Sequence, residues 1–170
     1  MKSNLLMNFT VDKENSTVHI KREFNASLAN VWSAWTEPEI LDQWWAPAPF
    51  KSKTKSMEFK EGGRRLYAMV GPENQEKWSF FEYSSISPKT NFKYSSTFCD
   101  AEANPDPNFG SSYWDVTFSE KGDLTIVDIA IKRNSLAELE KIIEMGFKEG
   151  FTIAMDGLDK IFETQNQNRF

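Results

Sequence analysis

The strongest constraint on the fold is a run of strand-like segments joined by short turns. Apolar residues alternate with polar ones, or fill both faces, in segments 51–59, 64–70, 76–87, 91–99, 113–118 and 124–131. Glycine pairs and Gly-Pro steps, such as Gly62-Gly63 and Gly71-Pro72, mark tight turns between them. Strands joined by such short turns must run antiparallel, so the sequence predicts an antiparallel sheet.

Ahead of these segments the sequence predicts a hairpin and two short helices. The hairpin pairs residues 8–12 with residues 17–25 around turn residues that begin at Asp12. Ser27 can cap the first helix, and Thr36 with Glu39 has the spacing of a capping box for the second. The helical region is predicted to end at the prolines that follow Trp45.

Residues 135–164 are predicted to form one long amphipathic helix that begins with a capping box. At about 100° per residue, one stripe collects the apolar positions around Ile143. These positions are Leu136, Leu139, Phe147, Ala154, Leu158 and Ile161. An antiparallel sheet offers one face to a core, and this helix is available to cover it. We therefore expect an α+β fold with a curved antiparallel sheet of about seven strands, two short helices and a long C-terminal helix on the concave face.

Composition indicates one soluble, globular domain. The chain has 170 residues, of which 39% are hydrophobic and 26% charged, which is not typical of a disordered or membrane-spanning chain. No repeat or linker divides it. We expect a single domain over residues 8–165 with flexible termini at 1–7 and 166–170. We also expect a cytoplasmic protein that is a monomer or a weak homodimer.

Three glycines lie on the apolar stripe of the predicted C-terminal helix. Gly146, Gly150 and Gly157 each cost about 1 kcal/mol relative to Ala in a helix interior, so something must offset them. One explanation is close packing of the helix against bulky residues of the sheet. The other is an apolar cavity between helix and sheet that holds a ligand.

Several motifs, taken together and in order, resemble one protein family. They are Arg22-Glu23-Phe24-Asn25-Ala26, Val31-Trp32-Ser33-Ala34-Trp35-Thr36-Glu37-Pro38, Trp44-Trp45-Ala46-Pro47, Gly62-Gly63-Arg64, Tyr67-Ala68-Met69-Val70-Gly71-Pro72 and Glu144-Met145-Gly146-Phe147-Lys148-Glu149-Gly150. Over residues 8–163 the chain resembles START-like (SRPBCC) proteins, in the branch named after the activator of a heat-shock-protein ATPase. The resemblance implies a helix-grip fold with a hydrophobic cavity under the C-terminal helix, and it implies no single activity.

We expect the protein to bind a small apolar ligand in an aromatic-lined cavity. The expected lining residues are Trp44, Phe59, Tyr67, Met69, Trp78, Phe80, Phe98, Trp114, Phe147, Gly150 and Phe151. Of the neighbours Trp44 and Trp45, at most one should point inward. Arg22 and Glu82 are in phase with apolar strand residues, as is Asp128. Such charges either lie at strand ends and reach solvent, or face outward, or two of them meet as a polar cluster that orients a ligand head group or acts as an acid or base.

The sequence offers little support for other functions. A net charge of −5 argues against binding to nucleic acid, and we expect no membrane span. His19 and Cys99 are each the single residue of their type, so no His/Cys metal site or nucleophile–base pair can be read, and we expect no cofactor. The alternatives are a chaperone cofactor that binds a partner protein and, less supported, an enzyme of the polyketide cyclase or hydrolase type. The long loop at 100–111 is either a lid over the cavity or a surface excursion.

Overall fold

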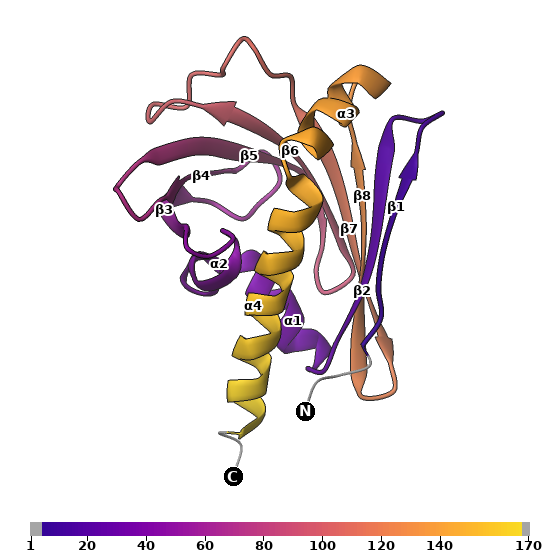
Figure 1. Ribbon diagram of the computed structural model, residues 1–170. Helices are drawn as coiled ribbons and strands as arrows, with labels where there is room; N and C mark the ends of the chain where they lie inside the picture. Colours follow the sequence, from indigo (N-terminus) through magenta and orange to yellow (C-terminus); the bar gives the residue numbers. More distant parts are fainter. Residues whose placement is uncertain (1–4, 168–170) are drawn as a thin grey trace.

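The computed structural model describes residues 5–167, and in it one curved sheet wraps around a C-terminal helix (Figure 1). The strands are β1 (Met7–Asp12), β2 (Thr17–Phe24), β3 (Lys51–Met57), β4 (Arg64–Val70), β5 (Glu76–Ser87), β6 (Asn91–Cys99), β7 (Ser112–Lys121) and β8 (Leu124–Lys132). The helices are α1 (Leu28–Thr36), α2 (Pro38–Trp44), α3 (Leu136–Glu144) and α4 (Phe147–Gln167). This arrangement confirms the predicted α+β class.

The eight strands form one sheet in the order β1-β2-β8-β7-β6-β5-β4-β3, and every neighbouring pair is antiparallel. Only the pairing of β2 with β8 joins strands that are distant in sequence, because α1, α2 and the other strands lie between them. Figure 1 shows α4 on the concave side of the sheet, with α1 and α2 on that side as well. The helices and the inward-facing strand residues therefore share one core.

The core is unusually rich in aromatic contacts, which accounts for the many Phe and Trp residues. The ring of Trp32, on α1, contacts the rings of Phe59, Phe92 and Phe118 at centroid separations of 5.8, 5.7 and 5.1 Å. All three pairs meet edge to face, the geometry that the charge distribution of aromatic rings favours. This cluster fills the space under α1, so the core is solid at that end.

The two predicted caps of the short helices have different outcomes. Ser27 accepts a hydrogen bond from the backbone N–H of Asn30 at 3.1 Å, as an N-cap residue should. The capping box at Thr36 is wrong, because Thr36 is the last residue of α1 and its hydroxyl donates to the carbonyl of Trp32 at 2.8 Å. Helix α2 therefore begins after Glu37 without a side-chain cap.

The prediction of one helix over residues 135–164 is wrong, because Gly146 divides it into α3 and α4. Gly146 has φ +95°, a left-handed conformation that a right-handed helix cannot continue. The predicted start holds, since Ser135 accepts from the N–H of Glu138 at 3.1 Å. The break also shifts the buried stripe, because the projection from Ile143 assumed an uninterrupted helix. The buried residues of α4 are Phe151, Ala154, Met155, Leu158 and Phe162.

The helix break predicts opposite effects for two Gly-to-Ala substitutions. Gly146→Ala is expected to lower the free energy of unfolding by about 1–2 kcal/mol, because alanine is strained at φ +95°. Gly157→Ala is expected to raise it by about 0.5–1 kcal/mol, because a Cβ at this position inside α4 meets no atom within 4 Å. Urea denaturation of both variants measures the difference. Changes of the same sign would contradict this explanation of the two glycines.

Helix α4 is fixed to the sheet by a buried arginine of β2. Arg22 is 6% exposed and pairs with Asp159, and its Nη2 lies 3.5 Å from a carboxylate oxygen of Asp156. Further along α4, the side-chain amide of Asn166 donates to the carbonyl of Asn25 at 3.0 Å. These contacts hold the C-terminal half of α4 in place, at a distance along the helix from Gly146 and Gly150.

Residues near both ends of the described chain contact the rest of the fold. The backbone N–H of Leu6 donates to a carboxylate oxygen of Glu23 at 2.9 Å, and β1 begins at Met7. At the other end, residues 166 and 167 continue α4. Residues 1–4 and 168–170 lie outside the described residues. None of the helices in residues 5–167 is both long and apolar enough to cross a bilayer.

Candidate ligand-binding cavity

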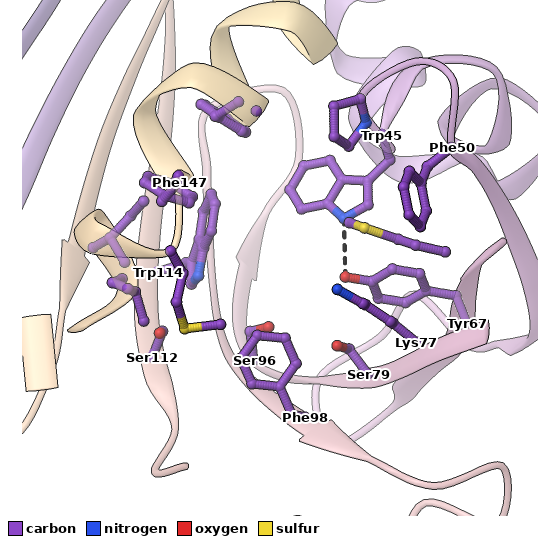
Figure 2. Close-up of a pocket in the computed structure, with 18 of the residues that line it drawn as sticks. Trp45, Phe50, Tyr67, Lys77, Ser79, Ser96, Phe98, Ser112, Trp114 and Phe147 are labelled. Carbon is purple, nitrogen blue, oxygen red and sulfur yellow. Dashed lines mark hydrogen bonds between the residues drawn. The ribbon is translucent and has the colours of Figure 1, made fainter. Parts of the chain in front are cut away.

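A cavity of about 310 Å³ lies between the concave face of the sheet and the helices α3 and α4 (Figure 2). Trp45, Phe50 and Tyr67 lie on one side of it, and Trp114 and Phe147 lie on the other. The complete lining is Trp45, Pro47, Phe50, Tyr67, Met69, Lys77, Ser79, Ser96, Phe98, Ser112, Trp114, Ile131, Arg133, Ile142, Met145, Gly146, Phe147, Gly150 and Phe151. Its volume and largely aromatic walls are those of a site for a small organic molecule.

The break between α3 and α4 helps to shape the cavity. Gly146 and Gly150 both line it, and a Cβ added to Gly150 would meet Pro47 Cγ at 3.5 Å, an ordinary contact. Gly157 is not among the lining residues, and a Cβ there would meet nothing within 4 Å. Of the three glycines on the predicted stripe, two therefore border open space and none is forced by tight packing against the sheet.

One wall is held by a hydrogen bond between two aromatic side chains. The indole N–H of Trp45, just after α2, donates to the hydroxyl of Tyr67, on β4, at 3.0 Å (Figure 2). Burial raises the pKa of Tyr67, and the nearby Arg65 guanidinium opposes this shift. Tyr67 is therefore a neutral phenol at physiological pH, and it fixes the orientation of the Trp45 ring against the cavity.

A buried charge network supports the same wall from behind. Arg65, on β4, is fully buried and donates to the Ser52 hydroxyl at 2.8 Å and to the Thr54 hydroxyl at 3.2 Å. Asp42, on α2, accepts from the same two hydroxyls, both at 2.8 Å, and lies 3.4 Å from Arg65 Nη2. The Arg65 guanidinium also lies over the Tyr67 ring at 4.0 Å. The network therefore joins α2 to β3 and β4 and positions both aromatic residues.

The sheet side of the cavity is polar at one end. Ser112 on β7 lies directly opposite Ser96 on β6, and Figure 2 shows both facing the cavity. Arg133 is 2% exposed, and its Nη1 donates to the Ser112 hydroxyl at 3.0 Å and to the carbonyl of Gly110 at 3.1 Å. Burial lowers the pKa of Arg133, which Glu138 opposes, but an arginine keeps its charge at neutral pH.

The rim of the cavity includes exposed apolar residues, so the cavity opens to solvent there. Phe98 is 37% exposed and Met145 is 58% exposed. The loop at 100–111 contacts this end, where the Phe109 ring packs on Phe98 at 5.2 Å. Lys141 Nζ, on α3, lies 4.4 Å from the centroid of the same Phe109 ring. The loop thus touches both the rim and α3.

The structure brings seven of the thirteen predicted site residues together around the cavity. They are Tyr67, Met69, Phe98, Trp114, Phe147, Gly150 and Phe151. Tyr67 and Met69 share a face of β4, as their spacing indicated. The other six predicted residues lie elsewhere, for three different reasons.

Three of the six lie on the outer face of β5, because the phase assigned to this strand was wrong. Lys77 and Ser79 line the cavity, whereas Trp78, Phe80 and Glu82 alternate with them and face outward. Aromatic residues occur on both faces of β5, so a two-residue period could not tell the faces apart. Lys55 lies over the Trp78 ring, Arg64 lies over the Phe80 ring, and Arg64 pairs with Glu82 at 3.8 Å.

Trp44 and Phe59 face the core away from the cavity. The indole N–H of Trp44 donates to the carbonyl of Ala34 at 2.9 Å, and its ring packs on Trp35 at 4.7 Å. Trp44 and Trp45 are both buried, at 2% and 6% exposure, although we expected only one to point inward. Both fit because α2 is packed on α1, on α4 and on β3. Phe59 belongs to the aromatic cluster under α1.

Of the alternatives for Arg22, Glu82 and Asp128, the structure does not show the one in which two of them meet as a polar cluster. Arg22 binds the aspartates of α4, and Glu82 is on the outer face. Asp128 lies opposite Lys21 of β2 and opposite Thr117 of β7, and it borders a shallow hollow on the outer face together with His19. Among the described residues, no group of three or more His, Cys, Asp or Glu side chains could hold a metal ion.

Among the residues that the sequence interpretation missed are Lys77 and Arg133 of the lining and the supporting Arg65, and of the two neighbouring tryptophans it expected Trp44 in the lining where the structure has Trp45. Arg65 could have been found, because it shares the phase of Tyr67 and Met69 along β4. Lys77 could have been placed in the cavity only if the inward-facing residues of β5 had been identified correctly. Arg133 follows β8, and it reaches the cavity only because β7 and the preceding loop fold beside it, which no local pattern indicates.

A curved antiparallel sheet that grips a C-terminal helix over a cavity defines the START-like helix-grip class of proteins. A family model described as "Activator of Hsp90 ATPase homolog 1-like protein" matches residues 25–163. The chain belongs to this family. No curated protein matches the sequence.

Solved structures share the whole fold. A protein from Mycobacterium smegmatis is 24% identical, with a TM-score of 0.85, over 92% of this chain and 96% of that chain. A protein from Arthrobacter aurescens is 25% identical, with a TM-score of 0.87, over 92% and 91% of the two chains. The AHSA1 protein from Silicibacter pomeroyi is 14% identical, with a TM-score of 0.71, over 88% and 99%. The proteins from Mycobacterium smegmatis and Silicibacter pomeroyi are less than 25% identical to this chain, so their similarity shows the fold alone.

Proposed function

We propose that the protein binds a small, largely apolar molecule in the cavity under α3 and α4. The observation that carries the proposal is the cavity itself, about 310 Å³ between sheet and helices in a core that is otherwise closely packed with aromatic rings. Open apolar space is unfavourable in a protein, because the side chains around it lose packing contacts. A bound molecule would restore those contacts and bury apolar surface at about 25 cal/mol per Å².

Tyr67 in the lining, and Tyr83, Tyr94 and Cys99 outside it, favour binding over covalent chemistry. Burial raises the pKa of Tyr67, Tyr83 and Tyr94, so these phenols stay protonated. Burial, together with the neighbouring Asp100, raises the pKa of the Cys99 thiol to about 11. A thiol with a raised pKa is a weak nucleophile at neutral pH. Cavity binding therefore needs fewer assumptions than catalysis by these groups.

Native mass spectrometry of gently purified protein tests the proposal. We expect a fraction of the protein to carry one additional small molecule, which dissociates when the complex is activated in the gas phase. Titration of stripped protein with the neutral dye N-phenyl-1-naphthylamine should restore a single occupied site and quench fluorescence from Trp45 and Trp114, which line the cavity. Protein without a bound molecule and without dye uptake would contradict the proposal.

The family itself supports a second candidate, a chaperone cofactor that binds a partner protein. The description of the family model names an activator of an Hsp90 ATPase. Such a role needs an exposed docking surface and does not need a cavity. In native mass spectra it would give a stoichiometric protein complex in place of a small-molecule adduct, so one experiment separates the two functions.

A further inference from the structure

We propose that the ligand is an amphipathic acid, whose anionic head group binds at the Arg133 end of the cavity while its apolar body lies under α4. This inference rests on the proposed function and names the chemical class of the ligand. Three features of the cavity carry it: the charge of the lining, the unpartnered hydrogen-bond donors, and the separation of polar from apolar walls.

The charged residues of the lining are all cationic. Lys77 and Arg133 line the cavity, and none of its lining residues is an aspartate or a glutamate. Figure 2 shows Lys77 extending from β5 into the cavity. Glu138 lies 3.4 Å from Arg133 Nη2, but it is on α3 outside the lining. An anion in the cavity would therefore meet the Arg133 guanidinium, whose charge Glu138 partly balances, and the ammonium group of the exposed Lys77.

Two buried donors that belong to the lining have no acceptor among the described residues. They are the Nε of Arg133, in a side chain 2% exposed, and the indole Nε1 of Trp114, in a side chain 7% exposed. Buried donors usually have a partner. Donors of Arg22, Trp35 and Arg65 outside the lining also lack one, so the two lining donors support an acidic ligand only together with the cationic lining. The Ser112 hydroxyl already accepts from Arg133, which leaves its own proton to donate. A carboxylate head group at this wall would offer several acceptor lone pairs to donors of this kind.

The polar groups of the cavity lie on its sheet side, whereas the helix side is apolar, which suits an amphipathic molecule. On the sheet side, Ser112 lies opposite Ser96 and both face the cavity (Figure 2), beside apolar residues such as Met69 and Trp114. The opposite side is formed by apolar residues of α3 and α4, among them Ile142, Phe147 and Phe151. A head group on the sheet at Arg133 therefore places an attached chain or ring system against the helices.

Three ligands that differ only in their head group test this inference. Decanoate, 1-decanol and decylammonium are titrated into stripped protein at pH 7, and their Kd values are measured by calorimetry or from tryptophan fluorescence. We expect decanoate to bind about tenfold more tightly than 1-decanol, the gain typical of a charge-assisted hydrogen bond. Decylammonium should bind most weakly, because Lys77 and Arg133 repel it.

Variants locate the head group through the ratio of the Kd of 1-decanol to that of decanoate, in which losses of apolar contact cancel. Arg133→Met should bring this ratio close to one, and Arg133→Lys should restore part of it. Trp114→Phe removes the indole N–H and should lower the ratio about threefold. Trp35→Phe is its matched control, because it removes a buried unpartnered indole N–H that is not in the lining. Lys77→Met, at an exposed residue, should lower the ratio even if Arg133→Met fails to fold.

The outcomes separate the two proposals. Equal binding of decanoate and 1-decanol by the unchanged protein would overturn the acidic head group and leave the apolar carrier intact. If the ratio of the two Kd values is unchanged in Trp114→Phe and in Lys77→Met, the proposed location of the head group is wrong. Failure of all three ligands to bind would overturn both proposals.

Discussion

Gly150→Leu is expected to abolish uptake of N-phenyl-1-naphthylamine while leaving the protein as stable as before, or more so. Gly150 lines the cavity from α4, and its Cβ would meet only Pro47, at 3.5 Å. The leucyl side chain would fill open space that the ligand otherwise occupies, with a gain of about 0.8 kcal/mol per buried methylene. Removing a helix-interior glycine adds about 1 kcal/mol. Dye fluorescence measures uptake, and urea denaturation measures stability.

Gly157→Leu is the matched control for this variant. Gly157 is on the same helix, but it is outside the cavity and has nothing within 4 Å of an added Cβ. The control should bind the dye as the unchanged protein does. A Gly150→Leu protein that is destabilised by about 1–3 kcal/mol, the usual effect of overpacking, and that still binds the dye would show that the space under α4 is not the binding site.

Asp42→Ala is expected to destabilise the protein by about 3–5 kcal/mol, a large part of the 5–15 kcal/mol typical of a domain. Arg65 is fully buried, and Asp42 is the carboxylate that faces it, at 3.4 Å. Removing Asp42 leaves the guanidinium charge uncompensated in the core. It also leaves the hydroxyls of Ser52 and Thr54 without their acceptor. Thermal and chemical denaturation measure the loss.

Two further variants show whether the buried charge is the cause. Glu82→Ala removes the partner of Arg64 from an ion pair in which both side chains are 51% exposed, and such pairs contribute about 0–1 kcal/mol. The double variant Asp42→Leu with Arg65→Met removes both charges and should recover much of the stability lost in Asp42→Ala. A loss for Asp42→Ala no larger than that for Glu82→Ala would contradict the role assigned to this network.

The Asp42–Arg65 network also positions residues that line the cavity. It holds α2 against β3 and β4, and Trp45 follows directly on α2. Trp45 in turn donates to Tyr67, over whose ring Arg65 lies. An ion pair between a buried arginine and a partly exposed aspartate is therefore a structural support of the aromatic wall. We infer that its residues position the site and do not touch the ligand.

The sequence by itself determined the architecture of this protein. Short turns between alternating segments required an antiparallel sheet, and one amphipathic segment near the C-terminus was available to cover it. These features are local, because turn chemistry and side-chain periodicity act over a few residues. Tyr67 and Met69 share one face of β4, as their two-residue spacing indicates, and both line the cavity.

The tertiary structure alone decided which side chains meet at the cavity. Aromatic residues occupy both faces of β5, so only packing against β4 and β6 shows that Lys77 and Ser79 face inward. The left-handed Gly146 ends one helix and starts another, which moves the buried stripe of α4. Arg133 reaches its place beside Ser112 across 21 residues of chain. Such contacts depend on the path of the whole chain, and a pattern confined to one segment cannot specify them.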